Sequence, residues 1–136
     1  MFTGCKSQPN EEVYISDFYN IHEEYKDAWG NVGKYDISLP YIHCDSKSAK
    51  KLNQTIKNEY KDLVDSLDEA KEEGYTLPYT KVSYDVYTHS NLLSLVIKEE
   101  VETEYPRYKV YHFDSKTKKR VSNKKLYRNI KSVKKI

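Results

Sequence analysis

Apolar and polar side chains alternate along the first part of the chain. Between Val13 and Asp27 the odd positions carry most of the apolar side chains, which is the two-residue period of a half-buried strand. Phe18 breaks this alternation. Residues 29–33 have turn chemistry and residues 34–39 are again β-prone, so the pattern predicts a β-hairpin. We expect Pro40 to end the pairing, because proline has no backbone N–H to donate.

The following segment changes to the period of a helix. Asp45 or Ser46 supplies an N-cap, and Gly74 is placed to end the helix. The spacing predicts one amphipathic helix of about seven turns with a solvated opposite face. The apolar residues recur at intervals of three and four: Ala49, Leu52, Ile56, Tyr60, Leu63, Leu67 and Ala70.

The period returns to two after this helix. Residues 82–87 alternate and residues 89–91 form a turn. Residues 92–103 form a long strand whose middle is apolar on both faces, as expected at the centre of a sheet. Residues 108–113 alternate again and end in the turn chemistry of residues 114–118.

Together these elements predict an α+β fold. One long amphipathic helix packs on an antiparallel sheet of about four to five strands, in the order β-β-α-β-β-β. A chain of 136 residues suits one core. We expect a polar leader or tether at 1–12, a single domain at 13–127, and a basic C-terminal segment at 128–136 that could begin a truncated segment.

Charge is divided unevenly along the chain. Residues 115–136 contain ten Lys and Arg and no acid, whereas residues 1–114 contain 13 basic and 21 acidic residues. The basic segment could bind nucleic acid, an anionic wall polymer or a membrane surface, or it could simply be solvated. Nucleic acid is not favoured, because Tyr127 is its one aromatic residue for stacking on bases.

The first residues indicate a location. Thr3-Gly4-Cys5 has the form of a bacterial lipobox, and the residues after it make a polar tether. Only four residues precede Cys5, so a longer precursor would have supplied the signal peptide. We expect lipid attachment at Cys5 on the extracellular face of the membrane, which leaves Cys44 free. The alternative is an ordinary cysteine near the start of the chain.

Catalytic and metal-binding patterns are weak. The four histidines lack the spacing and carboxylate context of a zinc site. His43 and Cys44 are adjacent on an extended segment, so their side chains point in opposite directions and cannot readily form a nucleophile–base pair. We therefore expect no enzyme activity, no catalytic residue, no cofactor and no metal.

An acidic segment near the predicted central strand is a candidate partner site. If that strand continues through Glu104, three carboxylates share one face beside tyrosines, which suits a cationic protein partner. A solvated strand face that discourages edge aggregation is the alternative. The candidate residues are Glu100, Glu102, Glu104, Tyr105, Tyr108 and Tyr111.

Several segments between residues 40 and 127 resemble a known family. They are Leu39–Ile42 with Ala49–Lys57, Val82–Tyr87 with Ser90–Ile97, and Phe113–Val121 with Leu126–Tyr127. In this order they are similar to the motifs of an extracytoplasmic module of low-GC Gram-positive bacteria. That module precedes the catalytic domain in some peptidoglycan deacetylases and forms part of the anti-sigma factor that binds lysozyme.

The resemblance implies a cell-envelope domain and transfers no catalytic residue. The family usually has Gly-Gly-Ala-His between its last two strands, whereas residues 99–107 contain neither glycine nor histidine. Lys118 replaces a turn glycine, and family members often continue beyond the equivalent of Tyr127. We predict a non-catalytic, lipoprotein-like binding or sensing domain whose partner is a cationic protein such as lysozyme or a cell-wall polymer. The alternatives are a truncated accessory domain of a peptidoglycan-modifying enzyme and a cytoplasmic nucleic-acid-binding protein.

Overall fold

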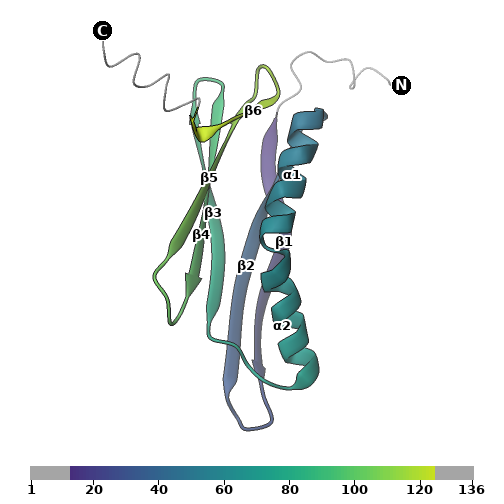
Figure 1. The fold of residues 1–136 in the computed structure, drawn as a ribbon, viewed down its shortest axis with the longest axis vertical. Helices are drawn as coiled ribbons and strands as arrows, with labels where there is room; N and C mark the ends of the chain where they lie inside the picture. Colours follow the sequence, from purple (N-terminus) through teal and green to yellow (C-terminus); the bar gives the residue numbers. More distant parts are fainter. Residues whose placement is uncertain (1–12, 125–136) are drawn as a thin grey trace.

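The computed structural model describes residues 13–124, which form a six-stranded sheet with two helices along one side (Figure 1). Cys5, the leader, the predicted domain end at 127 and the basic C-terminal segment at 128–136 lie outside the described residues. The elements are β1 (Tyr14–Lys26), β2 (Val32–His43), α1 (Lys47–Glu59), α2 (Lys61–Glu73), β3 (Thr80–His89), β4 (Leu92–Val101), β5 (Arg107–Asp114) and β6 (Lys119–Val121).

The strands lie side by side in chain order, from β1 to β6. Each neighbouring pair is antiparallel except β2 and β3, which are parallel. The prediction of an antiparallel sheet with four to five strands is therefore wrong. The helices carry the chain back along the sheet, so β3 starts in the same direction as β2. β6 has three residues, too few to show a period in the sequence.

Parallel pairing between β2 and β3 is limited to three residue pairs, from Tyr35–Thr80 to Ile37–Val82. Beyond it β3 no longer pairs with β2, and α1 packs against β2 there. The Asn53 side-chain amide accepts the N–H of Ile42 at 2.8 Å and donates to its carbonyl at 2.9 Å. The Asn53 side chain thus makes the hydrogen bonds to the β2 backbone that β3 does not make at this position.

The single long helix predicted from the apolar stripe is also wrong, because the structure has two short helices. Tyr60 separates them, with φ −106° and ψ 6°, and its N–H donates to the carbonyl of Asn58. The ring of Tyr60 is nevertheless buried, with 3% of its surface exposed. The break thus falls on a residue of the apolar stripe, and the stripe continues from α1 into α2. Gly74 ends α2 in the left-handed region, as predicted.

The β1–β2 hairpin is confirmed, but its second strand continues through Pro40 to His43. The expected end at Pro40 is wrong because Pro40 pairs with Asp17 beside a register shift, where a missing N–H is tolerated. That shift leaves Phe18 as the extra residue of a β-bulge. The break in the sequence alternation at Phe18 therefore marks a real irregularity.

The core lies between the helices and the sheet. Its largest fully buried side chains come from α1 and from four strands, with Leu52, Ile56, Ile37, Leu95 and Phe113 among them. Buried tyrosines contribute as well: the Tyr35 hydroxyl accepts the N–H of Leu77 at 2.9 Å. Among residues 13–124, neither helix is long and apolar enough to span a membrane.

Candidate functional site

Four aromatic side chains lie in a row where the start of β1 pairs with the end of β2; we call them the aromatic track. The rings of Tyr14 and His43 stack at 4.3 Å with an interplanar angle of 8°. His43 meets Tyr41 edge-on at 5.0 Å, and Tyr41 stacks on Phe18 at 5.6 Å. Tyr14 is 57% exposed and Phe18 45% exposed, so aromatic surface remains open to solvent.

The hairpin register assembles this row. Tyr14 lies opposite His43 and Ser16 lies opposite Tyr41, and side chains on opposite residues of a ladder are close neighbours. Phe18 joins the row because it is the bulged residue. Ile42, between the two aromatic residues of β2, is buried in the core and held by Asn53. Because alternate residues of a strand face opposite sides, Tyr41 and His43 lie on the other side of β2 from Ile42, where they line clefts with Lys50 of α1.

Two adjoining clefts follow the aromatic track, and both include Tyr41 and Lys50. One has a volume of about 350 Å³ and is lined by Val13, Tyr14, Tyr41, His43, Cys44, Asp45, Lys50 and Lys118. The other has a volume of about 170 Å³ and is lined by Phe18, Tyr41, Lys50, Asn53, Gln54 and Lys57. The Lys57 ammonium lies 5.6 Å from the centroid of the Phe18 ring. The surface therefore combines open aromatic faces with lysines.

His43 also makes a short polar contact. Its Nε2 lies 2.6 Å from the hydroxyl of Ser16 on the paired strand. Cys44 is a half-buried free thiol whose Sγ donates to the Ser46 hydroxyl at 3.7 Å. The imidazole and the thiol thus have different partners. Among the described residues, the structure records no carboxylate bonded to His43 that would orient it as in a serine-hydrolase triad.

The other histidines lie apart from one another. His22 Nδ1 contacts Asp36 at 2.9 Å and His112 Nδ1 contacts the Ser94 hydroxyl at 2.7 Å, while His89 is exposed at the end of β3. Burial lowers the pKa of His112. Within residues 13–124 no group of three or more His, Cys, Asp or Glu side chains is arranged to hold a metal ion.

The residues predicted to bind a partner do not share one strand face. β4 ends at Val101, so Glu102 and Glu104 lie in the connection to β5, where Pro106 has no N–H to extend the ladder. Glu102 Oε2 accepts the N–H of Tyr79 at 3.3 Å, and Glu104 lies 3.9 Å from Arg107. Glu100 remains on β4 and pairs with Lys98 at 3.4 Å.

The three tyrosines of that prediction separate too. Tyr105 is 91% exposed in the connection and Tyr108 is 59% exposed on β5, whereas Tyr111 is 6% exposed in the core. The premise of a strand face that continues to Glu104 is therefore wrong, and Tyr111 offers little surface. A partner role for the remaining five residues stays a prediction.

A larger cleft of about 550 Å³ lies beside the junction of α1 and α2. Four of its five charged side chains already pair: Arg107 with Glu99 at 2.8 Å, and Lys109 with Glu59 at 3.4 Å. The ion pair with Glu99 raises the pKa of Arg107. A ligand would have to compete with these pairs, which makes this cleft a weaker candidate than the aromatic track.

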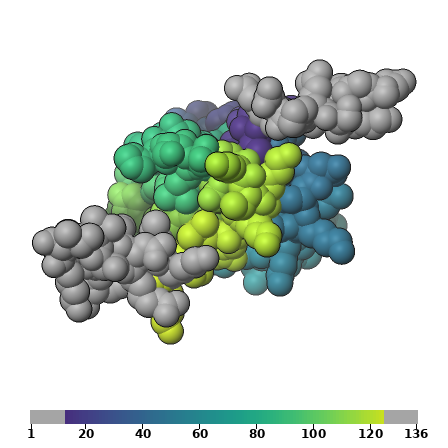
Figure 2. Space-filling view, turned by 90° about the horizontal axis from the view of Figure 1, so that it is seen from above, coloured from purple at the N-terminus to yellow at the C-terminus, as the bar shows by residue number. Residues whose placement is uncertain are grey.

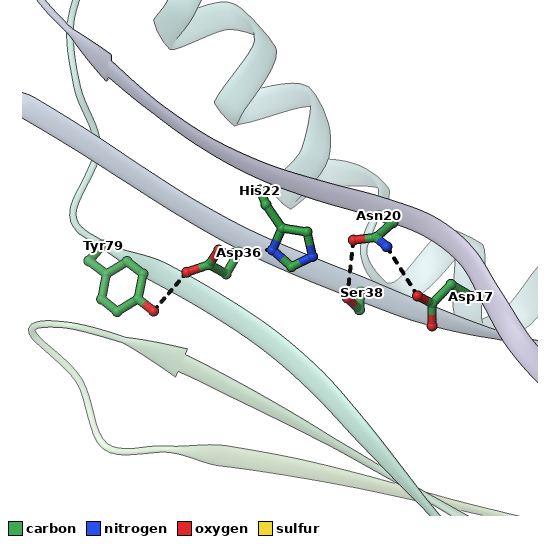
Figure 3. A network of polar contacts seen from close by, with 6 residues as sticks. All are labelled: Asp17, Asn20, His22, Asp36, Ser38 and Tyr79. Carbon is green, nitrogen blue, oxygen red and sulfur yellow. Dashed lines mark hydrogen bonds and ion pairs between the residues drawn. The ribbon is translucent and has the colours of Figure 1, made fainter.

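A polar network covers β1 and β2 on the side of the sheet that faces away from the helices (Figure 3). The Tyr79 hydroxyl donates to Asp36 Oδ2 at 2.9 Å, and the hydrogen bonds from His22 and Tyr79 lower the pKa of Asp36. Farther along, Asn20 donates to Asp17 at 3.1 Å. Asp17 also accepts the Tyr84 hydroxyl at 2.5 Å; burial, followed by this bond, raises the pKa of Tyr84 to about 12. These groups satisfy one another and present few unpaired polar atoms to a ligand.

No family model matches the chain, and no curated protein matches it significantly. The resemblance to the extracytoplasmic module therefore stays a prediction that rests on the quoted sequence segments. The geometry of the aromatic track is the main guide to function.

Proposed function

We propose that the protein is a non-catalytic binding module of the bacterial cell envelope and that the aromatic track holds a polysaccharide chain of the wall. The row formed by Tyr14, His43, Tyr41 and Phe18 carries this proposal. Its position beside two adjoining clefts gives an elongated ligand a continuous surface.

Sugar rings suit such a surface for a physical reason. An aromatic face is electron-rich, and the C–H groups on one face of a pyranose ring carry positive partial charge, so the two stack. Lys50 and Lys57 stand along the same row and can donate to the hydroxyl, amide and carboxylate oxygens of an acidic wall glycan. A ligand of successive sugar units would use several rings at once.

The cellular location is part of the proposal. Attachment through Cys5 on the extracellular face of the membrane would place the track within reach of the wall. Absence of catalysis is proposed because the Ser16–His43 pair has no recorded carboxylate partner among the described residues. The same binding role would serve an accessory domain of a wall-modifying enzyme.

The test is binding of the purified protein to insoluble peptidoglycan and to a soluble N-acetylglucosamine hexasaccharide. We expect Tyr14→Ala and Tyr41→Ala each to weaken binding by about three- to tenfold, the loss expected for one aromatic contact. Binding is measured by pull-down for the insoluble polymer and by titration of tyrosine fluorescence for the oligosaccharide.

The matched control is Tyr87→Ala, because Tyr87 is 59% exposed on β3 and Tyr14 is 57% exposed on β1. The control should bind like the unmodified protein. Equal losses in Tyr14→Ala and Tyr87→Ala, or no binding of either glycan by the unmodified protein, would contradict the proposal. Circular dichroism establishes that each variant is folded.

A further inference from the structure

A second surface lies at the end of the molecule where α1 begins. The Arg120 N–H of β6 donates to the hydroxyl of Ser48 in α1 at 2.7 Å, so the turn after β5 and the start of α1 are held together. Figure 2 looks onto this end and shows the turn and β6 beside the first residues of α1. The sequence alone separates these segments by about seventy positions.

Basic side chains gather where these segments meet, and we call this surface the basic end. The surface has seven basic residues, of which six are exposed and one, Lys118, is half-buried. Its members are Lys47, Lys50, Lys51, Lys116, Lys118, Lys119 and Arg120.

Two carboxylates lie among these cations. Asp45 is 3.5 Å from Lys50, and Asp114 Oδ1 accepts the N–H groups of Lys116 and Thr117 within the turn. Seven basic and two acidic side chains leave an excess of five positive charges. The Arg120 guanidinium also lies 5.1 Å from the centroid of the Tyr111 ring, so this side chain packs over the edge of the core.

This charge does not serve the stability of α1. Lys47 and Lys50 lie in its first turn, which contains no acid, although a helix N-terminus favours negative charge. The cap is supplied by Ser46, whose hydroxyl accepts the N–H of Ala49 at 3.0 Å. Cations that oppose the helix dipole are better explained by a negatively charged partner outside the protein.

The start of the described chain indicates which partner. Val13 lines the same cleft as Lys50 and Lys118, so the leader joins the domain at the basic end. Eight residue steps separate Cys5 from Val13 and span at most about 28 Å. A lipid on Cys5 would therefore hold this end, rather than the end at which α2 finishes, next to the bilayer.

We propose that the basic end binds the surface of an anionic phospholipid membrane. The argument from Val13 rests on the proposed anchor at Cys5, whereas the charge of the surface does not. Contact with the lipid headgroups would orient the domain, with the turn of residues 114–118 and the start of α1 against the membrane. Each lysine or arginine near such a surface strengthens binding by about fivefold at moderate ionic strength.

The test uses the chain without lipid, so it does not depend on the anchor or on glycan binding. Sedimentation with vesicles of equal parts phosphatidylglycerol and phosphatidylcholine is compared with sedimentation with pure phosphatidylcholine vesicles. We expect binding to the anionic vesicles alone and its loss in about 0.5 M salt, where charges are screened beyond a few ångströms. Lys116→Glu combined with Lys119→Glu should weaken binding at least tenfold.

The control reverses two exposed lysines elsewhere, Lys26→Glu with Lys81→Glu, which changes the net charge equally. This control should lose less than threefold. Equal losses in the two double variants, or no binding to anionic vesicles, would overturn the proposal. Tighter binding to soluble teichoic acid or to single-stranded DNA than to vesicles, at equal phosphate and salt, would also overturn it and assign the surface to a polymer. Lys50 and Lys118 stay unchanged because they line the aromatic track.

Discussion

The two helices share one apolar stripe but carry opposite charge. α1 has four lysines and one acid, whereas α2 has two lysines and six acids. α1 contacts β2 and β6, close to the aromatic track and the basic end. α2 faces β1, where Lys71 pairs with Glu23 at 2.5 Å and the Tyr25 hydroxyl donates to the carbonyl of Tyr75.

The difference in charge shows that the interactions that hold the helices in place are distinct from the side chains that they present to solvent. Lys47 in the first turn of α1 and Glu73 in the last turn of α2 both oppose the helix dipole. Both helices are held instead by buried apolar residues, such as Ile56 in α1 and Leu67 in α2. Surface charge is thus available for binding, and each helix presents its own sign of charge.

Among the variants that test this comparison, truncation of a core residue should have the largest effect on the stability of the protein. We expect Ile56→Ala and Leu67→Ala each to lower the free energy of unfolding by about 2–5 kcal/mol, because both side chains are almost fully buried. Urea denaturation followed by circular dichroism measures the change. Half-buried Val64→Ala is the control and should cost less. A loss under about 1 kcal/mol at either buried site would show that packing does not hold that helix.

Asn53→Ala should come next, because it removes a bond that α1 has and α2 lacks among the described contacts. The N–H and carbonyl of Ile42 would lose their partners, which we expect to cost about 2–4 kcal/mol. The neighbouring exposed Gln54→Ala should change stability by less than about 0.5 kcal/mol. Equal stabilities of the two variants in urea would contradict the role assigned to Asn53.

Lys47→Glu tests whether the charge of α1 opposes its stability. A carboxylate in the first turn should interact well with the helix N-terminus and raise the free energy of unfolding by about 0.3–1 kcal/mol at low salt. The gain should diminish in 1 M NaCl. Thermal unfolding at both salt concentrations measures it. A loss of stability at low salt would mean that Lys47 stabilises the fold.

The Lys71–Glu23 pair should make the stability of the protein depend weakly on pH. The hydrogen bond to Glu23 raises the pKa of the Lys71 ammonium group, so the stabilisation is complete below the unfolded pKa of about 10.4 and is lost as pH rises through the folded value. Both side chains are more than a third exposed, so we expect about 0.2–1 kcal/mol. Lys71→Gln should therefore destabilise at pH 8 and match the unmodified protein at pH 12. Lys50→Gln, whose partner Asp45 is almost fully exposed, is the control and should show no such difference.

Local patterns predicted the elements well and their assembly less well. The hairpin, the helical residues, the turn at Ser90 and the strands after it follow from residue period and turn chemistry. The parallel contact of β2 with β3 could not be predicted, because it depends on how far the helices carry the chain back. The break at Tyr60 left no mark in the apolar spacing, since Tyr60 is itself a core residue.

The candidate site was harder to predict for a similar reason. Tyr14 and His43 are 29 positions apart and meet only because of the hairpin register. In the sequence His43 is one of four scattered histidines and a neighbour of Cys44, and no local pattern indicates Tyr41 as a binding residue. One usable signal was present: Phe18 interrupts the alternation, which is typical of a bulge. The predicted continuous strand face is not formed, because β4 ends at Val101 and Glu102 and Glu104 lie in the connection to β5.

The short parallel contact at Tyr35–Ile37 has a consequence for the order of folding. β1 with β2, and β3 with β4, are local hairpins of the kind that form in microseconds. The two hairpins join only when β2 pairs with β3, which brings together residues 45 positions apart in three residue pairs. This pairing requires the intervening helices to have formed. Formation of this contact should therefore limit the folding rate. The amides of residues 35–37 should exchange with solvent only upon global unfolding, whereas the amides of β6 exchange through local opening.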